Sequence, residues 1–546
     1  MQESKNIDLT ALPDLGLDRI APSHKTVLLA LGAVAVIYLA GVTSSWWPTP
    51  DSAMYLALGR SMAQGEGFRS NGEFGPLIQP GFPWILATLY SLFGSGFWAP
   101  NLFEALCGIA SVCLIYLTLA RLGGKTLALL AAVMTGLSHS FYLNSHEVLT
   151  DMPGVAAFWA MAYAMLRAQK GAWLWLAPAA LLAAILAFLR VPDMLAVFAL
   201  AVAVAIDPAG GRRLTRLIRA AVPLAAGGAA LAVLYFWGRS LTAATLAYTP
   251  ILQKGHFDVG VLANNLLKTL SDTMTGQRSW VIGLVGLALM LAGIVSRWRR
   301  GTRLSIVALL YCLTVYCVTG GWAVEPRYWL PVQGFAIYAM LQGLLWGVWQ
   351  VCRWREKFAS PKVFHTAALV LAAIVVAFNI PQVALLATYY PYLSHIGQSR
   401  YYDKIRDGDF RDLYPVADIL KQRVGPGETV AVCGNTSKAL HYLSGRRVVQ
   451  LETATQEDAA RLAPLLDSDR RIRLVVLEME KDKDAAKPSF ANKLKEQLRQ
   501  IEQEGKLKLI FPGRRCLVFQ RTLAGDKIEP PETKPAHANA GKENEQ

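Results

Sequence analysis

The feature that most constrains the fold of this chain is a series of long apolar segments separated by short polar breaks. A helix needs roughly 20 mostly apolar residues to cross a bilayer, and several segments reach that length with their flanks. A single segment can be a buried core helix, but the series predicts a polytopic α-helical membrane protein with about 11 transmembrane helices. The expected spans are 26–46, 98–120, 126–143, 151–168, 173–190, 192–206, 220–238, 280–296, 304–321, 329–350 and 364–386.

The charged residues are few and unevenly placed. They make up 17% of the 546 residues, whereas about 25% is usual for a soluble protein. The net charge of +15 comes from basic residues at the ends of the apolar segments, among them Arg121, Lys125, Arg167, Arg212, Arg213, Arg297 and Arg303. Basic loops stay on the cytoplasmic side of a membrane, so this placement argues against nucleic-acid binding. It predicts a cytoplasmic N-terminus and, with an odd number of spans, an extracytoplasmic C-terminal region.

The chain is expected to divide into four parts. Residues 1–24 form a cytoplasmic N-terminus, and residues 25–389 form the transmembrane part, with long outer loops at 47–97 and 239–279. Residues 390–523 have the composition of a soluble α/β domain, and residues 524–546 that of a disordered tail. Strand-like apolar runs in the α/β domain lie at 429–433, 447–451, 473–477, 506–511 and 516–519.

Two features of the predicted α/β domain leave alternatives open. Cys433 and Cys516 are either free thiols or, if the domain faces an oxidising compartment, a disulfide. The run Gly434-Asn435-Thr436-Ser437 follows a strand and fits either an ordinary turn or a contact with an anion at a helix start.

Two acids stand at the outer ends of predicted spans. Asp51 follows the first span and Asp151 precedes the fourth. A carboxylate at a membrane boundary is costly and is often functional, but aspartate is also a good N-cap, and Thr150 can share that task. Capping and catalysis both fit each acid, and the two acids lie on the same predicted face of the membrane.

A basic and aromatic pair, Arg327 and Tyr328, stands at the outer end of a later span. The planar guanidinium of Arg327 can bind a phosphate through two parallel hydrogen bonds. The alternative is interfacial anchoring, with Arg327 paired to Glu325. His139, His146 and Glu147 form only a weak metal-binding pattern, so no cofactor is predicted and a divalent metal is not indicated.

Taken in order, these motifs resemble the type C glycosyltransferase superfamily. The motifs are Asp51 after the first span, Pro80-Gly81-Phe82-Pro83-Trp84 closing a Gly- and Pro-rich first loop, Thr150-Asp151, and Arg327-Tyr328-Trp329-Leu330-Pro331. The nearest branch is the bacterial protein O-mannosyltransferase-like group, which includes the lipid A aminoarabinose transferase, and the resemblance covers about residues 25–390.

The resemblance implies a role for each motif. Asp51 would be the general base, Asp151 would orient or activate the acceptor, and Arg327 with Tyr328 would bind the donor phosphate. Glu325, Glu147 and Gln79 are expected in supporting positions. Relatives often carry a basic residue where this chain has Gln79, so the donor phosphate is expected either to be bound less tightly or to be shared with Arg190. The mannosyltransferases proper have Asp-Glu where this chain has Asp51-Ser52, which argues against protein mannosylation.

The function that the resemblance implies is sugar transfer, with inversion, on the periplasmic face of a bacterial inner membrane. The donor would be a polyprenyl-phosphate sugar, and the acceptor a lipid, a glycan or a protein, in contact with membrane lipids. The alternative is a polytopic transporter or lipid flippase, which would place polar residues near the bilayer midplane and show paired repeats. A third hypothesis is a non-catalytic assembly protein that works through its α/β domain.

Overall fold

The computed structural model describes residues 21–71, 73–74, 79–168, 172–208, 211–241, 259–298, 303–319, 326–352, 361–396, 401–402, 410–434, 436–451, 464, 466, 469, 471–479 and 490–522. The chain divides into two compact units, Met1–Tyr401 and Tyr402–Gln546. The predicted disordered tail, the N-terminal residues 1–20 and Glu325 lie outside the described residues.

The described elements of the first unit are helices, apart from a short hairpin of β1 (Arg69–Ser70) and β2 (Glu73–Phe74). Each of the 11 predicted spans overlaps a helix. The helices are α1 His24–Ala40, α2 Pro50–Ala63, α3 Gly81–Phe93, α4 Trp98–Gly123, α5 Lys125–Gly136, α6 His139–Asn144, α7 Asp151–Arg167, α8 Leu176–Leu189, α9 Asp193–Ile206, α10 Arg213–Leu241, α12 Val259–Thr275, α13 Trp280–Trp298, α14 Val307–Thr319, α15 Pro326–Cys352, α16 Pro361–Ala384 and α17 Tyr390–Ile396.

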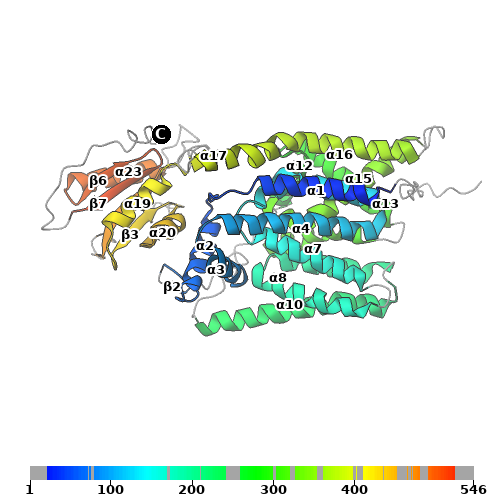
Figure 1. The fold of residues 1–546 in the computed structure, drawn as a ribbon, viewed down its shortest axis with the longest axis horizontal. Coiled ribbons are helices and arrows are strands. Elements are labelled where there is room, and N and C mark those ends of the chain that lie inside the picture. The colour runs from blue at the N-terminus through cyan, green and yellow to red at the C-terminus, as the bar shows by residue number, and fades with distance from the viewer. Residues whose placement is uncertain are drawn as a thin grey trace, which may run out of the picture. The chain divides into compact units, whose positions relative to one another are not determined.

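Several of these helices have the length and composition of membrane spans. Within the described residues, four stretches are long and apolar enough to cross a bilayer: Trp98–Gly123, Arg213–Trp237, Trp280–Trp298 and His365–Ile396. Shorter apolar helices accompany them, including α1, α5 and α9. Figure 1 shows α1, α4, α7, α10 and α16 running alongside one another, with α2 and α3 together at one end. The exact number of spans stays a prediction.

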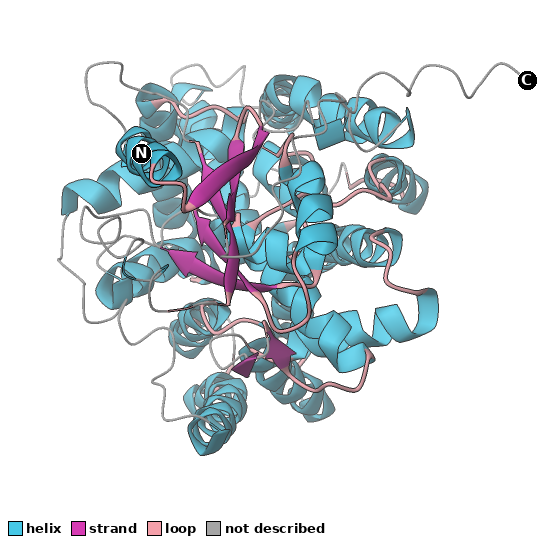
Figure 2. Ribbon diagram, turned by 90° about the vertical axis from the view of Figure 1, so that its left-hand side faces the viewer, coloured by secondary structure: helices cyan, strands magenta, loops and turns pink. Residues whose placement is uncertain are grey.

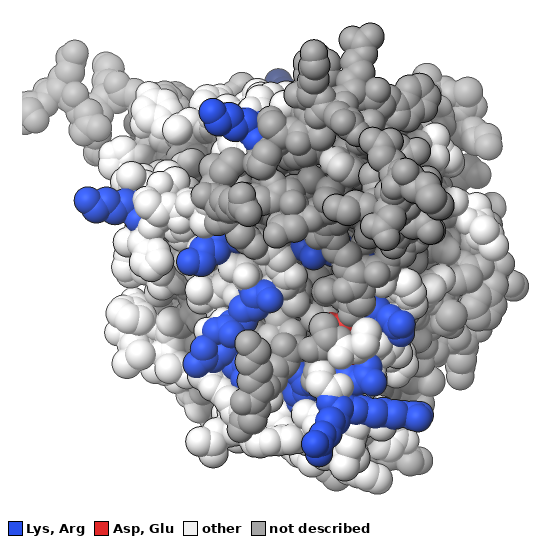
Figure 3. Space-filling view, turned by 90° about the vertical axis from the view of Figure 1, so that its right-hand side faces the viewer, with Lys and Arg blue, Asp and Glu red and all other residues white. Residues whose placement is uncertain are grey.

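The basic residues gather at the other end of these helices. Arg121 lies in the last turn of α4, Arg167 ends α7, and Arg212 immediately precedes α10. Figure 3 views the molecule from this end, and Lys and Arg are spread over the face, with almost no Asp or Glu visible among the described residues. This arrangement fits the positive-inside pattern, whereas the two candidate acids begin helices at the opposite end.

The first predicted span is longer than the helix that forms. Helix α1 ends at Ala40, and the next residue, Gly41, packs so closely that an added Cβ would lie 2.3 Å from the Tyr142 hydroxyl oxygen. Trp46 is fully buried, stacks on Phe97 and donates its indole N–H to the Ser52 hydroxyl at 3.0 Å. The helix therefore ends six residues before the predicted end of the span at residue 46, and Trp46 packs inside the protein.

The second unit contains a five-stranded mixed sheet of order β4-β3-β5-β7-β6. The strands are β3 Thr429–Cys433, β4 Arg447–Leu451, β5 Ile472–Glu478, β6 Leu507–Pro512 and β7 Cys516–Arg521, and the described helices are α19 Leu413–Arg423, α20 Ser437–Ser444 and α23 Phe490–Gln503. Strands β4, β3 and β5 are parallel to one another, and β7 runs antiparallel to both of its neighbours, β5 and β6. Figure 2 shows the strands as magenta arrows. Buried residues of strands and helices form its core, including Ala431, Val475, Leu498 and Phe519.

Cys433 and Cys516 are buried free thiols rather than a disulfide. Strand β5 lies between the strands that carry them. Strands are spaced about 4.8 Å apart, so the two backbones are separated by more than the roughly 7 Å that a disulfide spans. Burial raises the pKa of the Cys433 thiol to about 12 and also raises that of Cys516, so both are expected to be unreactive at neutral pH.

The described residues of the Gly434–Ser437 run, all but Asn435, make an anion contact within the chain. The Thr436 backbone N–H, just before α20, donates to Glu478 Oε2 at 3.0 Å. Gly434 has a φ of 142° and lies so close to Glu478 that an added Cβ would be 2.4 Å from the same oxygen. A carboxylate of the chain itself thus takes the place that an external anion would need.

Candidate functional site

Helix α2 begins with a capping box that does not use Asp51. The Thr49 side chain accepts from the Ser52 backbone N–H at 3.1 Å, and the Ser52 hydroxyl oxygen accepts from the Thr49 backbone N–H at 3.0 Å. The interpretation of Asp51 as the N-cap is therefore wrong. Asp51 lies in the first turn, where the helix dipole stabilises its charge, and its side chain is available for other contacts.

Asp51 forms an ion pair with Arg327, which is 276 residues away in the sequence. The distance from Arg327 Nη1 to Asp51 Oδ2 is 3.1 Å, and the side chains are 35% and 44% exposed for Arg327 and Asp51, respectively. Arg327 lies in the first turn of α15, because that helix begins at Pro326 rather than near 329 as predicted. Both partners thus begin helices, and the pair is open to solvent.

A second ion cluster is buried. Arg190 lies between α8 and α9 and bridges two carboxylates, with Nη2 2.8 Å from Asp151 Oδ1 and Nη1 3.1 Å from Asp193 Oδ1. The three side chains are between 0% and 6% exposed. Asp151 begins α7, and no side chain caps that helix, so the capping interpretation of Asp151 is also wrong. Its carboxylate instead pairs with Arg190.

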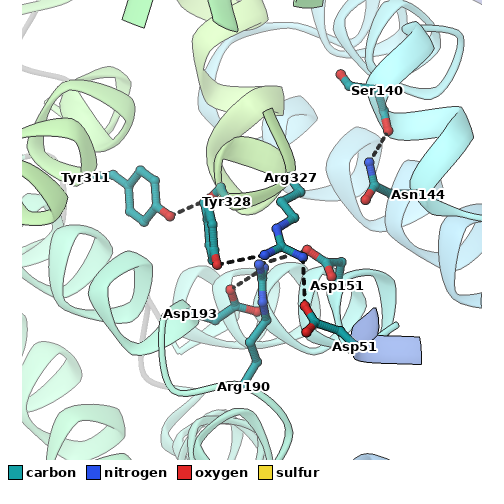
Figure 4. Close-up of polar contacts among 9 residues, drawn as sticks. All are labelled: Asp51, Ser140, Asn144, Asp151, Arg190, Asp193, Tyr311, Arg327 and Tyr328. Atoms are coloured by element: carbon teal, nitrogen blue, oxygen red, sulfur yellow. Dashed lines mark hydrogen bonds and ion pairs between the residues drawn. The ribbon is translucent and has the colours of Figure 1, made fainter. Parts of the chain in front are cut away.

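Tyr328 joins the exposed pair to the buried cluster (Figure 4). Its hydroxyl oxygen accepts from Arg327 Nη2 at 3.1 Å. The Arg190 guanidinium lies 4.9 Å from the centre of its ring, within the range of a cation–π interaction. Its backbone carbonyl accepts a hydrogen bond from the Tyr311 hydroxyl. Residues from α2, α7, the α8–α9 connection and α15 therefore form one continuous polar network.

The structure brings together five of the predicted site residues: Asp51, Asp151, Arg190, Arg327 and Tyr328. The supporting candidates Gln79 and Glu147 are buried, but they contribute no atom to the contacts that join these five. Glu325, the partner considered for Arg327, lies outside the described residues. The predicted roles of these residues stay predictions.

Two acids near the network were missed from the sequence. Asp193 follows Arg190-Val191-Pro192, and a Pro-Asp step at the start of an apolar helix was a usable signal. Glu104 is a fully buried acid within α4 that lies close to Asp151 and Glu147. An ionisable residue inside an apolar segment is a functional candidate in its own right, so both were within reach of sequence reasoning.

The histidines do not form a metal centre in the described part of the chain. Both ring nitrogens of His146 lie against backbone carbonyl oxygens, Nδ1 at 3.0 Å from Tyr142 and Nε2 at 2.9 Å from Tyr38. Neither nitrogen is left to bind a metal. Among the described residues, no three His, Cys, Asp or Glu side chains are arranged to hold one.

The chain is similar to known proteins in part of its sequence and in its fold. Residues 76–238 match the family model of dolichyl-phosphate-mannose-protein mannosyltransferases. The search of curated proteins found no significant match. Among solved structures, the fold is similar to that of ArnT from Cupriavidus metallidurans bound to undecaprenyl phosphate, with 13% identity and a TM-score of 0.58 over 91% of this chain and 98% of that one.

A second similar structure is the archaeal oligosaccharyltransferase AglB from Archaeoglobus fulgidus, in complex with an inhibitory peptide and a dolichol-phosphate. It is 12% identical, with a TM-score of 0.51 over 83% of this chain and 69% of that one. The shared fold shows that the chain is a polytopic membrane protein. Together with the family match, it confirms the resemblance to the type C glycosyltransferase superfamily, and the fold is similar to that of ArnT.

Proposed function

From this resemblance we propose that the chain is a membrane glycosyltransferase that moves a sugar from a polyprenyl-phosphate donor to a lipid, glycan or protein acceptor. The observation that carries the proposal is the position of Arg327. The helix dipole disfavours a cation in the first turn of a helix, and Arg327 occupies that place in α15 with its side chain partly exposed. A guanidinium beside the free N–H groups of a helix start is a site for a phosphate.

The resting contacts of Arg327 suggest how the donor prepares the site. In the structure its Nη1 is held by Asp51, so a donor phosphate that binds Arg327 competes with that carboxylate. Once the phosphate binds the Arg327 guanidinium in place of Asp51, the Asp51 carboxylate can act as a general base. The base therefore becomes available only when the donor is bound.

The transfer step then follows as a single displacement. The acceptor hydroxyl oxygen attacks the anomeric carbon while the bond from that carbon to the phosphate oxygen breaks, which inverts the configuration. The hydroxyl proton passes to Asp51, and the charge left on the lipid phosphate is stabilised by Arg327. Asp151 is proposed to orient the acceptor from the side of the buried cluster.

The placement of the charges favours an enzyme over a transporter. Asp51, Asp151 and Arg327 all lie in the first turns of their helices. Transporters instead gather such groups near the bilayer midplane. We therefore place the site at the membrane boundary and, from the basic residues at the opposite helix ends, at the periplasmic face of an inner membrane.

This placement predicts that the C-terminal unit is extracytoplasmic. A phosphatase that works only outside the cytoplasm should be active when fused after Gln546, because the basic helix ends hold the N-terminus inside. A reporter that works only in the cytoplasm should be inactive at the same point. The reverse pattern would contradict both the odd number of spans and the periplasmic placement of the site.

The proposed function predicts that the purified protein consumes one class of polyprenyl-phosphate sugar. It should be incubated with a panel of such donors that differ in the sugar, and lipid phosphate release should be followed by mass spectrometry. Release from at least one donor, dependent on an added acceptor extract, is the expected result. If no donor is consumed while undecaprenyl phosphate still binds, the transport hypothesis becomes the better one.

A further inference from the structure

The transfer mechanism gives no task to two residues of the buried ion cluster, Arg190 and Asp193. We infer that Asp193 is a positioning residue for the donor-binding Arg327: it holds Arg190 against the Tyr328 ring, and Tyr328 in turn directs the Arg327 guanidinium. This inference rests on the proposed function, because it specifies how the phosphate-binding group of that site is kept in place.

The first step is the contact between Asp193 and Arg190. Asp193 is 0% exposed, and its Oδ1 lies 3.1 Å from Arg190 Nη1. Helix α7 passes so closely that a Cβ on Gly154 would lie 2.2 Å from Asp193 Oδ2. Glycine at 154 therefore leaves room for the carboxylate, and α7 restricts its movement on that side. Asp193 in this way anchors Arg190.

The second step is the charge on Arg190. Its guanidinium is shared by the carboxyl groups of Asp151 and Asp193, so both of its terminal nitrogens already have partners within the chain. Its side chain is 6% exposed. We therefore infer that Arg190 supports the site. The sequence had led us to expect that Arg190 binds the donor phosphate.

The third step runs through Tyr328. One side of its ring lies against Arg190, at 4.9 Å from the guanidinium carbon to the ring centre. Its hydroxyl oxygen accepts a hydrogen bond from Arg327 Nη2 at 3.1 Å, and its backbone carbonyl accepts one from the Tyr311 hydroxyl. Since Arg327 Nη1 is turned toward Asp51, Tyr328 fixes the remaining orientation of the guanidinium. Releasing Arg190 removes one of the contacts that keep the ring in place.

The test measures the affinity of the purified full-length chain for undecaprenyl phosphate and, with an active donor, kcat and KM separately. Asp193→Ala is expected to weaken lipid-phosphate binding and raise the donor KM by about tenfold, the size of a coupling between neighbouring polar groups. Asp193→Asn keeps an acceptor oxygen for Arg190 and should recover most of the affinity. A purely structural role would lower the yield of folded protein and leave the affinity of the folded fraction unchanged, which would overturn the inference.

A double-mutant cycle shows whether the effect runs through Tyr328. Tyr328→Leu removes both contacts with Arg327, the hydroxyl hydrogen bond and the ring 4.9 Å from its guanidinium carbon. Asp193→Ala should therefore weaken binding little further in that background. Fully additive effects would overturn the proposed route. Because binding is measured without turnover, a chain that binds undecaprenyl phosphate but transfers no sugar would refute the proposed function and leave this inference testable.

The matched control is Asp412→Asn in the second unit. Asp412 is also buried, and its Oδ2 accepts from the backbone N–H groups of Arg515 and Cys516. Its neutralisation should lower thermal stability without changing the affinity for undecaprenyl phosphate. If the control weakens binding as much as Asp193→Ala does, the effect of Asp193 is a general loss of structure and the inference fails.

Discussion

Asp51→Asn is expected to lower the turnover number for sugar transfer by about 10²–10⁴. The amide keeps the shape of the side chain and an acceptor for Arg327, but it cannot take the proton of the acceptor hydroxyl. The capping box of Thr49 and Ser52 stays intact, so the variant loses only an exposed ion pair and a first-turn charge. Each contributes at most about 1 kcal/mol. Transfer rates and thermal unfolding in detergent, measured on the same preparation, separate the two effects.

The same variant is expected to bind undecaprenyl phosphate at least as tightly as the wild type, because the Asp51 carboxylate no longer competes for Arg327. The control is Asp418→Asn, which neutralises another exposed ion pair, with Lys421 at 3.2 Å in the second unit. It should change neither binding nor transfer. Transfer by Asp51→Asn at more than roughly a tenth of the wild-type rate would remove Asp51 as the base and favour Asp151.

Arg327→Ala is expected to lower kcat/KM by about 10²–10³, the usual loss when one preplaced donor to a developing negative charge is removed. Arg327→Lys should also lose at least about tenfold. The two terminal nitrogens of Arg327 bond in two directions, to Asp51 and to Tyr328, and an ammonium on a flexible chain cannot reproduce that geometry. Donor affinity and transfer should be measured for both variants.

The control for this pair is Arg471→Lys. Arg471 is 62% exposed and forms an ion pair with Asp469 at 3.0 Å in the second unit, so the same substitution there should leave transfer unchanged. Near-normal turnover of Arg327→Lys would mean that any cation suffices at this position. Arg327 would then be an interfacial anchor, and the donor phosphate would have to be bound elsewhere.

Much of the helical framework was predictable because it depends on local sequence. Every expected span overlaps a helix. A helix pairs the backbone polar groups of an apolar segment within the segment itself, however the helices pack against one another. The ends were less well predicted. Helix α1 stops at Ala40, six residues before the predicted end of its span, and α15 begins at Pro326, three residues before the predicted start. Proline is favoured at the first position of a helix, whereas hydropathy marks only the apolar part of a segment.

The candidate site was predictable as a set of residues but not as a set of contacts. Asp51, Asp151, Arg190, Arg327 and Tyr328 were all identified from their places at segment ends and from the family resemblance. Their partners were not. A carboxylate at a helix start fits a cap as well as an ion pair, and only the packed helices show that Thr49 is the cap of α2 and that Asp51 pairs with Arg327.

The sequence by itself determined that this chain is a membrane protein with acids at one set of helix ends and basic residues at the other, because hydropathy and charge placement act locally. The tertiary structure decided which charges meet. Arg190 joins Asp151 to Asp193 only because α7 approaches closely at Gly154, and Tyr328 links that cluster to Arg327. Such pairings depend on how helices pack across long sequence separations, and no local pattern encodes them.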